Sequence, residues 1–491
     1  MKRLIIPVAL SLFAIPSFAG GYLTTTNQNT AFYRMPAHNA TIGTEGAYYD
    51  PAGIAFMKDG WHVSLDIQSV WQRRHVNSTF APFAYRKGND GSSQRKYIGV
   101  TNVPVLPHMD LAFKKDRWFG SFHFGPIAGG GSAKFSDGLG SFEANYAMLP
   151  VLVNRLAGSN VVTAYSSDIE FTGGQTYWGG QFNFGYRVAP KLSVSIGARL
   201  VYATAAYDGS ISNIQLEMGG NMLPAATALT AMLTEAAKTN PTIAALISSG
   251  KLDVNDIVGD RKVDVYQRGF GIAPIISVHY KPGKWDLAAR YEFNTSIRLK
   301  NHTAENGDAG MSMFKDGKKL AGDVPALLAA GVQYNFSDRL RAQVGYNHFF
   351  EKQAKTYNSA TDSDDKQDLI KHHTFEILFG AEYDLSKTFT ISAGGHKTTF
   401  GWGDDYAFLS DMGFSTNSWS FGLGTRMHLT EKLSADLAVY KTFYSHVTKN
   451  ISDYAATITR SLGALGVQPV PGSDKMTRLS TCVGISLNYD F

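Results

Sequence analysis

Hydrophobic and polar side chains alternate along most of this chain, and its last segment shows the pattern most clearly. Between Arg478 and Phe491, every second position from Leu479 onward carries a side chain suited to an apolar environment, and the positions between carry mostly polar or small ones. Successive side chains of a strand point to opposite faces, so this segment predicts a strand with one apolar and one polar face. The pattern recurs along the chain, as at 192–202 and 419–427, and predicts an all-β fold.

Connections between the alternating runs come in two sizes that follow one another. The short turns lie at 114–116, 189–191, 281–284, 337–338, 386–387 and 430–432. The long loops lie at 73–101, 128–173, 205–266, 300–324, 351–371, 400–415 and 448–475. Six short turns and seven long loops join fourteen strands, and in outer-membrane barrels the short turns are periplasmic and the long loops extracellular. We therefore expect a 14-stranded antiparallel transmembrane β-barrel over residues 61–491. A soluble β-sandwich, the alternative, does not need strands of about ten residues with one lipid-like face each.

The first residues predict export. Lys2 and Arg3 precede an apolar run at 4–15, and a small-residue cleavage site follows at 17–19, so residues 1–19 are expected to form a signal peptide. No other stretch approaches the roughly 18 apolar residues that a helical span needs. Because a bilayer tolerates only helices and closed sheets, a closed barrel in the bacterial outer membrane is the expected location.

Composition narrows the function classes. The chain contains 49 Gly, 24 Tyr and 30 Phe, which suits strands that are half lipid-facing and flanked by aromatic girdles. The formal net charge is +5, or +3 without Lys2 and Arg3, which is too small to indicate a nucleic-acid partner. Cys482 is the only cysteine, so it forms no internal disulfide, and we expect it to be a buried, inward-facing side chain.

Residues 20–60 precede the first strand and fit neither a strand nor a tail. They are rich in Gly, Ala, Thr and Asn, carry no charge block, and contain the turn-like segment Asp50-Pro51-Ala52-Gly53. A disordered tail would be more charged and less aromatic. Fourteen strands enclose a space too wide for wall side chains to fill, so we expect these residues to form a hatch inside the lumen.

These motifs resemble the FadL/TodX family of outer-membrane transporters for long-chain fatty acids and other hydrophobic molecules. Asp50-Pro51-Ala52-Gly53, within 46–57, resembles the Asn-Pro-Ala plug motif of that family, with Asp in place of Asn. Further resemblance covers essentially the whole mature chain and lies in 192–203, Arg268-Gly269-Phe270-Gly271 and the strand pair that follows it to Ile297, Asp323-Val324-Pro325 and the ending Leu487-Asn488-Tyr489-Asp490-Phe491. The resemblance implies a fourteen-strand barrel, an N-terminal hatch and a ligand path that leaves sideways through the wall into the membrane.

The third strand contains residues that weaken its hydrogen bonding and thus provide a physical basis for such an exit. It is interrupted by Gly125, Pro126, Gly129, Gly130 and Gly131. Proline has no N–H for the ladder and glycine weakens a strand, so neighbouring hydrogen bonds should be lost there. We expect a lateral gate at these residues. The alternative is that Pro126 only ends the strand at the loop.

The extracellular loops are expected to contain helices with apolar stripes. The patterns at 225–238, 241–249, 144–156 and 451–465 are helical, and Leu229, Met232 and Leu233 share one side of the first. The resemblance implies that the loops 205–266 and 300–324 capture the ligand. We therefore expect Leu229, Met232 and Leu233 to line the capture groove, with ordinary packing inside the loop as the alternative.

A carboxylate anchor is only half retained. The family's arginine falls on Thr204 here, and its lysine falls near Lys352 or Lys355, which are the expected ligand-binding lysines. A neutral hydrophobic ligand is equally compatible. Inward-facing charges could serve the same purpose, but most should pair with acidic residues across strands; they are Arg199, Arg290, Glu292, Arg339, Arg341, Arg426 and Arg478.

The expected function is uptake of hydrophobic small molecules, captured by the loops and released through the third strand. The expected partners are this ligand and outer-membrane lipid, with the chain as a monomer. No cofactor or metal is expected, since the acidic loop segment at 362–368 lacks the rest of a calcium-loop pattern. A general porin and a lipid-modifying enzyme are the alternatives; a porin would lack the hatch, and no G-x-S-x-G elbow occurs.

Overall fold

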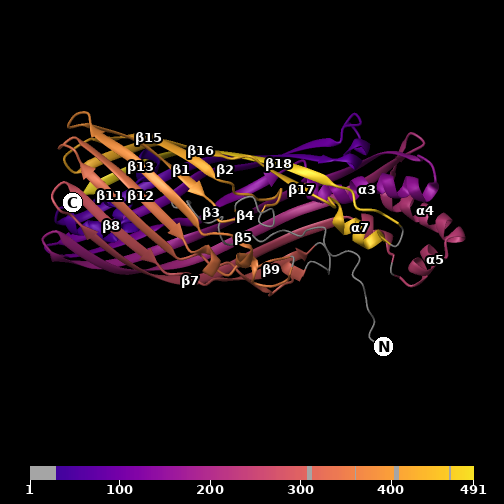
Figure 1. Ribbon diagram of the computed structural model, residues 1–491, viewed down its shortest axis with the longest axis horizontal. Coiled ribbons are helices and arrows are strands. Elements are labelled where there is room, and N and C mark those ends of the chain that lie inside the picture. Colours follow the sequence, from indigo (N-terminus) through magenta and orange to yellow (C-terminus); the bar gives the residue numbers. More distant parts are fainter. Residues whose placement is uncertain (1–28, 251, 307–311, 360, 403–408, 464–465) are drawn as a thin grey trace.

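The computed structural model describes residues 29–250, 252–306, 312–359, 361–402, 409–463 and 466–491, and the predicted signal peptide lies outside them. In this part of the chain, fourteen strands form a closed antiparallel barrel (Figure 1), as predicted. Each strand pairs with the next, and the last pairs with the first, as in Val63 opposite Tyr489. The barrel strands are β1 Gly60–Phe80, β2 Gln94–Lys115, β3 Trp118–Phe135, β4 Val162–Ala189, β5 Leu192–Met218, β7 Arg261–Tyr280, β8 Trp285–Glu292, β11 Leu327–Asn335, β12 Leu340–Phe349, β13 Thr374–Asp384, β14 Phe389–Thr399, β15 Ser418–His428, β16 Leu433–Tyr444 and β18 Gly472–Asp490.

Shorter elements extend this barrel. The additional strands are β6 Asn221–Pro224, β9 Arg298–Asn306, β10 Lys319–Ala321 and β17 Val447–Ile451. The α-helices are α1 Thr30–Arg34, α2 Gly46–Tyr49, α3 Gly140–Ala157, α4 Ala225–Thr239, α5 Pro241–Ser248, α6 Val254–Val258 and α7 Ala456–Leu462. Single 3-10 turns are η1 Pro51–Phe56, η2 Ala81–Tyr85, η3 Ser312–Phe314, η4 Glu351–Gln353 and η5 Lys366–Leu369. None of the helices described is long and apolar enough to cross a membrane.

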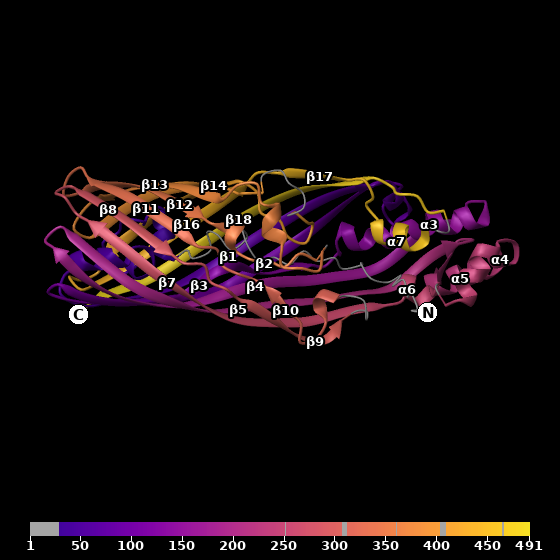
Figure 2. The same cartoon turned by 60° about the horizontal axis from the view of Figure 1, so that its bottom comes forward.

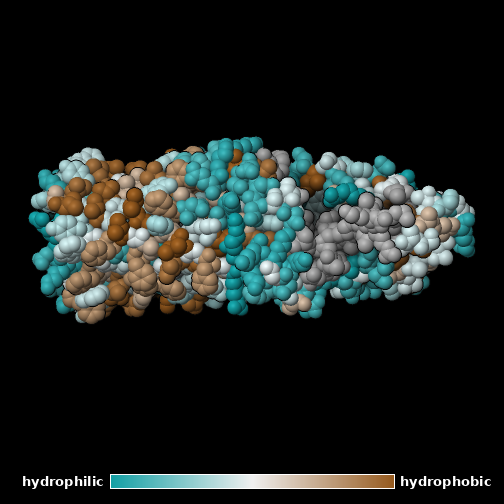
Figure 3. All heavy atoms as spheres, turned by 90° about the horizontal axis from the view of Figure 1, so that it is seen from below, coloured by the Kyte–Doolittle hydropathy of each residue, from teal (hydrophilic) through white to brown (hydrophobic). Residues whose placement is uncertain are grey.

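The outer surface divides into an apolar and a hydrophilic part. On the face shown in Figure 3, apolar residues gather over the half of the molecule that holds the short turns, and a belt of hydrophilic residues follows next to them. Exposed side chains of the apolar part include Leu65, Ile67, Ile196, Leu423 and Ile485. Such an outward apolar band on a closed sheet is the architecture of a bacterial outer-membrane barrel.

Several barrel strands continue far beyond this band, which corrects the expected loop boundaries. The loops expected at 73–101 and 205–266 begin inside ladders, because β1 runs to Phe80 and β5 to Met218. The loop expected at 128–173 likewise contains the end of β3 and the start of β4. Above the band the outward positions become polar while the backbone ladder continues. A pattern based on lipid-facing residues therefore ends before the strand does.

Helices α3, α4, α5 and α7 gather at the end of the molecule opposite the C-terminus (Figures 1 and 2). The helices expected at 225–238 and 241–249 are confirmed as α4 and α5, and that at 144–156 lies within α3. The pattern at 451–465 yields only the short α7, with residues 464–465 outside the described part. These helices enclose a separate apolar core with the upper strands; its buried members include Phe142, Leu149, Leu229, Leu233, Ile257 and Ile458.

Candidate transport site

Residues 29–57 lie inside the ring of strands. Helix α1 contacts β1, β14, β15, β16 and β18, whereas α2 contacts β2, β3 and β4, and η1 contacts β2 to β5 and β7. These strands surround the segment from several sides, and nearly all of its residues are buried. The expected boundaries of 20–60 and the function of a hatch remain predictions, since residues 20–28 lie outside the described part. We call residues 29–57 the hatch segment below.

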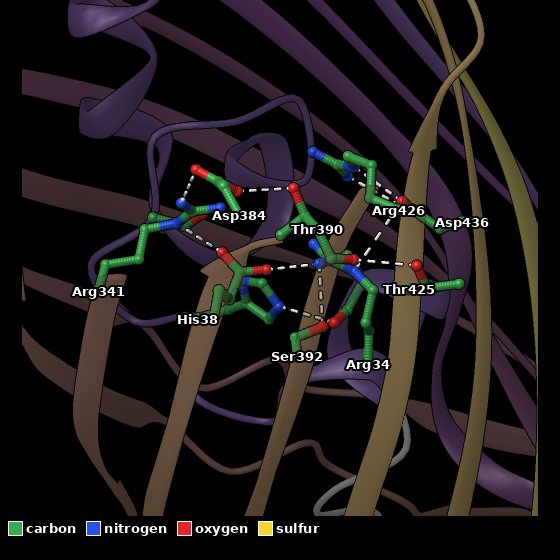
Figure 4. Close-up of polar contacts among 12 residues, drawn as sticks. Arg34, His38, Arg341, Asp384, Thr390, Ser392, Thr425, Arg426 and Asp436 are labelled. Atoms are coloured by element: carbon green, nitrogen blue, oxygen red, sulfur yellow. Dashed lines mark hydrogen bonds and ion pairs between the residues drawn. The ribbon is translucent and has the colours of Figure 1, made fainter. Parts of the chain in front are cut away.

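Ion pairs fix the hatch segment to one side of the barrel (Figure 4). Arg34, the last residue of α1, contacts Glu382 of β13 at 2.6 Å and donates a 2.9 Å hydrogen bond to Ser392 of β14. Arg341 also forms an ion pair with Glu382, at 2.8 Å. Asp436 of β16 accepts two hydrogen bonds from Arg426, of 2.7 and 2.8 Å, and its carboxylate lies 3.9 Å from the guanidinium of Arg34. Strands β12 to β16 thus present two carboxylates that hold the single arginine of α1.

A second charged group holds α2. Arg199 contacts Glu292 at 2.5 Å, and Arg290 contacts the same carboxylate at 3.0 Å. Both guanidinium groups lie over the ring of Tyr48, at 4.5 and 4.8 Å from its centre. The expected pairing of inward charges across strands is confirmed for Arg199 of β5 with Glu292 of β8, whereas Arg290 and Glu292 lie on the same strand. Tyr48 of the hatch segment contacts both guanidinium groups through its ring.

The Asp50-Pro51-Ala52-Gly53 motif anchors η1 to β5 and β7. Asp50 accepts a 3.1 Å hydrogen bond from the Gly53 N–H and lies 2.7 Å from Nδ1 of His279. The Ala52 N–H donates to Ser277, and the Ala52 carbonyl accepts from Ser193 at 2.6 Å. A Cβ on Gly53 would lie 2.2 Å from the Thr41 carbonyl, so this position requires glycine. Asp in place of the family's Asn allows a charge-assisted contact with histidine.

The wall is broken between β2 and β3. Gly99 and Val100 pair with Phe135 and Lys134, and pairing resumes only at Met109 opposite Phe124. Residues 101–108 of β2 and 125–133 of β3 therefore have no partner across this interface. Both strands keep their other neighbours, β1 and β4, along most of this stretch. The break is thus confined to one interface, and we call it the β2/β3 gap.

All five expected gate residues lie on the β3 side of this gap. Pro126 does not end the strand, because β3 continues to Phe135 and Pro126 pairs with Trp178 of β4. The β3–β4 register shifts after Pro126 and again between Gly129 and Gly131, so Gly130 has no partner on β4. Gly129 and Gly131 adopt φ angles of +93° and +72°, which favour glycine. A Cβ on Gly125 would lie 2.4 Å from the His108 ring, so this glycine admits the His108 side chain.

A cavity of about 390 Å³ adjoins the gap inside the barrel. Its side toward the gap is largely apolar and includes Val103, Val105, Leu106, Pro126, Phe171 and Trp178. Val105 is 59% exposed, so the lining reaches the outer surface of the wall. The side formed by β1, β15, β16 and β18 is polar and carries Gln72, Arg74, Ser418, Ser420, Thr442, Arg478 and Ser480. Cys482 is buried and lines the same cavity, so its expected inward position is confirmed.

The segment 409–417 covers this cavity on the extracellular side, and we call it the roof loop. Met412, Gly413, Phe414 and Ser415 line the cavity from above. Asp411 accepts hydrogen bonds from the Ser141 N–H at 2.8 Å and from the Ser141 hydroxyl at 3.0 Å, in the first turn of α3. A carboxylate at a helix N-terminus is favourable.

Two buried carboxyl groups, one in the roof loop and one on β18, influence each other through their charges. Burial raises the pKa of Asp411. Burial also raises the pKa of Asp474, at the extracellular end of β18, to about 7, and the charge of Asp411 adds to the effect. Asp474 accepts hydrogen bonds from Ser78 and Tyr454.

The expected ligand-binding residues lie elsewhere. Leu229 and Leu233 are buried in the loop core, and Met232 packs against it. Lys352 and Lys355 are exposed and are not among the residues that line the cavity. Their role in ligand capture therefore remains a prediction. Thr204, where the family's arginine falls, does line the cavity, and its hydroxyl donates to the Thr176 carbonyl at 3.1 Å.

Two features of the site do not follow from the sequence pattern, which predicts a loop at 73–101 and an ordinary strand over 101–113. Pro104 and Pro107 lie in the stretch of β2 that has no partner on β3, and they lack the N–H groups that a ladder needs. Two prolines three positions apart in a central strand indicate missing ladder hydrogen bonds, and they are visible in the sequence alone. Arg74 falls within the predicted loop, although on β1 it continues the inward-facing side chains of Gln68, Val70 and Gln72.

Comparisons with known proteins support the same architecture. No family model matches the sequence, and no curated protein matches it. Among solved structures, a FadL homologue of Pseudomonas aeruginosa is similar with a TM-score of 0.60 at 12% identity, covering 96% of this chain and 100% of that chain. The toluene transporter TbuX of Ralstonia pickettii gives 0.51 at 14% identity, covering 94% and 98%. The toluene transporter TodX of Pseudomonas putida gives 0.53 at 13%, covering 96% and 100%. The expected resemblance is therefore confirmed in the fold, and the chain has the fold of the FadL and TodX outer-membrane transporters.

Proposed function

We propose that this protein is an outer-membrane channel through which hydrophobic small molecules enter the cell, and that they leave the barrel sideways through the β2/β3 gap. The observation that carries the proposal is the contact between the gap and the luminal cavity. Val103, Val105 and Leu106 of β2 and Pro126, Gly129 and Gly131 of β3 line the cavity from both sides of the unpaired stretch. Lateral release keeps a hydrophobic molecule out of water, which is worth roughly 0.8 kcal/mol for each methylene group that enters the acyl layer.

Two further observations support transport over the alternatives. A general porin needs an open lumen, whereas residues 29–57 fill part of this one and are held by the buried ion pairs of Arg34. The similar structures named above are described as a FadL homologue and as toluene transporters, which favours a channel over a lipid-modifying enzyme.

The experiment that tests the lateral path narrows the gap without touching the hatch. Val105→Phe places a larger side chain in the gap, at a position without a pairing partner on β1 or β3. We expect uptake of radiolabelled oleyl alcohol, by cells that lack their own channel for hydrophobic compounds, to fall severalfold. Val100→Phe is the matched control, because Val100 lies on the same strand, is exposed and pairs with Lys134.

Folding of both variants is checked by heat-modifiable gel mobility. Unchanged uptake in a folded Val105→Phe protein contradicts lateral release and favours a route past the hatch segment. A separate measurement addresses the porin alternative: the intact protein should conduct ions poorly in planar bilayers, and deletion of residues 20–60 should raise the conductance. A large conductance in the intact protein contradicts a closing role of the hatch.

A further inference from the structure

Three basic side chains lie next to one another on the outer surface of the barrel. Lys300 of β9 is the cross-strand partner both of Arg268 on β7 and of Lys319 on β10. Directly opposed residues of antiparallel strands lie on the same face of a sheet, and all three of these side chains are exposed. We call Arg268, Lys300 and Lys319 the basic row. None of them is among the residues that line the luminal cavity.

The basic row lies at one edge of the apolar band. On β7, the outward side chains from Tyr280, beside the short turn at 281–284, to Phe270 are all apolar or aromatic, and Phe270 is 74% exposed. From Tyr280 to Phe270 the strand advances about 33 Å, or about 25 Å in height at a tilt of about 40°, which is the height of a lipid-facing band. Arg268 is the next outward position, on the side away from the short periplasmic turns.

Aromatic rings mark the same level. Tyr202 of β5 and Phe270 have ring centres 4.7 Å apart, and the guanidinium of Arg268 lies 4.7 Å from the centre of the Tyr266 ring. Girdles of aromatic residues flank the lipid-facing band of such barrels at both interfaces. Strand β9 lies on the side of the molecule that Figure 3 shows, where a hydrophilic belt follows the apolar part. The basic row therefore lies at the level of the lipid head groups in the outer leaflet.

The protein does not neutralise this charge within the part of the chain that the structure describes. The neighbouring Arg298 contacts Asp364 at 3.2 Å, but no member of the basic row forms an ion pair with a described residue. The next outward carboxylates on β7 and β9 are Asp264 and Glu305, which lie opposite each other. Asp264 is four residues from Arg268, or about 13 Å along the strand. Like charges directly opposite each other are destabilising, so the basic row favours an external anion.

We propose that the basic row binds the phosphate of a lipid head group in the outer leaflet of the membrane. A guanidinium donates two parallel hydrogen bonds to a phosphate, and lysine ammonium groups bind phosphate as point charges. Clusters of basic residues at a bilayer surface attract anionic lipids. The acyl chains of the bound lipid lie along Phe270 and Ile272, which are exposed on the same face of β7. This site goes beyond the proposed transport function, because it uses neither the cavity nor the β2/β3 gap.

The test compares two lipids that differ only in their head groups. Purified full-length protein in detergent is mixed with dioleoyl phosphatidic acid or with dioleoyl phosphatidylcholine, and bound lipid is counted by native mass spectrometry. Phosphatidic acid carries an anionic phosphomonoester, whereas the choline group neutralises the phosphate of the second lipid. We expect the parent to bind phosphatidic acid more tightly. Arg268→Gln, Lys300→Gln and Lys319→Gln should each weaken that binding about fivefold and leave phosphatidylcholine binding unchanged.

Lys262→Gln is the matched control. Lys262 is exposed on the same face of β7, but it lies six residues beyond Arg268, or about 20 Å along the strand and outside the band. Its loss changes the net charge as much as each test substitution does. We therefore expect Lys262→Gln to bind phosphatidic acid like the parent. An equal loss of binding in Lys262→Gln and Lys300→Gln would show a general effect of charge and overturn the proposal.

Thermal unfolding separates lipid binding from a structural role. Without lipid, the variant with all three substitutions should unfold at the same temperature as the parent or slightly above it, because it lacks the opposed like charges. Phosphatidic acid should raise the unfolding temperature of the parent more than that of this variant. Lys300→Arg keeps the charge and should keep the lipid bound, and loss of binding in that variant contradicts the proposal.

Inorganic phosphate distinguishes a lipid site from a site for soluble anions. It offers the same charged group without acyl chains, so at the concentration of the lipid it should not displace phosphatidic acid. Displacement would assign the basic row to a soluble anion and reject the lipid. Equal binding of phosphatidic acid by the parent and by the variant with all three substitutions would likewise overturn the proposal.

Discussion

The two sides of the barrel are built differently. On the β12–β16 side, the ladder between β12 and β13 runs through all ten residues of β12, from Leu340 to Phe349, without a shift. The same side holds the hatch segment through Arg34. On the β2–β3 side, the ladder is interrupted for eight residues of β2, from Thr101 to His108, and the space next to it is a cavity. A closed barrel can therefore leave one pair of neighbouring strands partly unpaired, provided that the other strands hold the hatch segment and keep their own ladder hydrogen bonds.

The largest effect is expected when the hatch segment is detached from the β12–β16 side of the barrel. Arg34→Ala removes the cation that Glu382 and Asp436 surround, and breaking a buried ion pair costs about 3–5 kcal/mol. We expect the hatch segment to dock less well and ion conductance in planar bilayers to rise. Arg339→Ala, at an exposed position, should leave the conductance unchanged. Equal conductance of the Arg34→Ala and parent proteins would mean that this network does not close the lumen.

Proline substitutions compare the two interfaces directly. Val344 of β12 pairs with Val332 and with Phe379, so Val344→Pro should cost about 3 kcal/mol by removing a ladder hydrogen bond. Val105 has no partner on β1 or β3, so Val105→Pro should cost much less. The urea midpoint of unfolding, followed by gel mobility, measures both. A similar loss in both variants would show that the β2/β3 gap is paired in the membrane.

A pH change should affect the roof loop over the open side, and this is the smallest of the three effects because it is local. The folded-state pKa of Asp474 is raised to about 7, above the ordinary value, so its contribution to stability is present at low pH and is lost as pH rises toward and through 7. The ionised Asp474 then repels Asp411, which binds Ser141. Amide hydrogen exchange of residues 409–417 should be slower at pH 5 than at pH 8, relative to the same residues in Asp474→Asn.

In Asp474→Asn the side-chain carbonyl can still accept from Ser78 and Tyr454 without acquiring a charge. Its roof loop should therefore show only the intrinsic pH dependence of exchange. An identical excess exchange at pH 8 in both proteins would exclude Asp474 as the cause.

The sequence predicts the membrane-facing half of this fold well, because lipid imposes a strict alternation on each strand. The run from Leu479 to Phe491 and the short turns at 281–284 and 386–387 follow that rule. It fails above the membrane band, where β1 continues to Phe80 and β5 to Met218 without the lipid-facing side chains of their lower parts. There the ladder is kept by neighbouring strands and by the loop core, neither of which a single-strand pattern contains.

The site is less predictable for a related reason. Gly125, Pro126 and the glycines at 129–131 indicated a weak strand, since their effect on hydrogen bonding is local. Arg34 gave no comparable signal, because its partner Ser392 lies 358 positions away and only the closed ring brings them together. The sequence predicts that Arg478 faces inward. That it lies opposite Arg74 depends on the register between the first and last strands, which the sequence does not contain.

The length of β4 has a consequence for the way in which a molecule first meets the protein. Its 28 residues, at about 3.3 Å each, span about 90 Å along the strand, or about 70 Å of height at a tilt near 40°. A lipid-facing band is about 25 Å tall, so more than half of this height projects from the cell surface. The apolar core around α3 and α4 is therefore held well above the lipid-facing band, at the far end of these long strands.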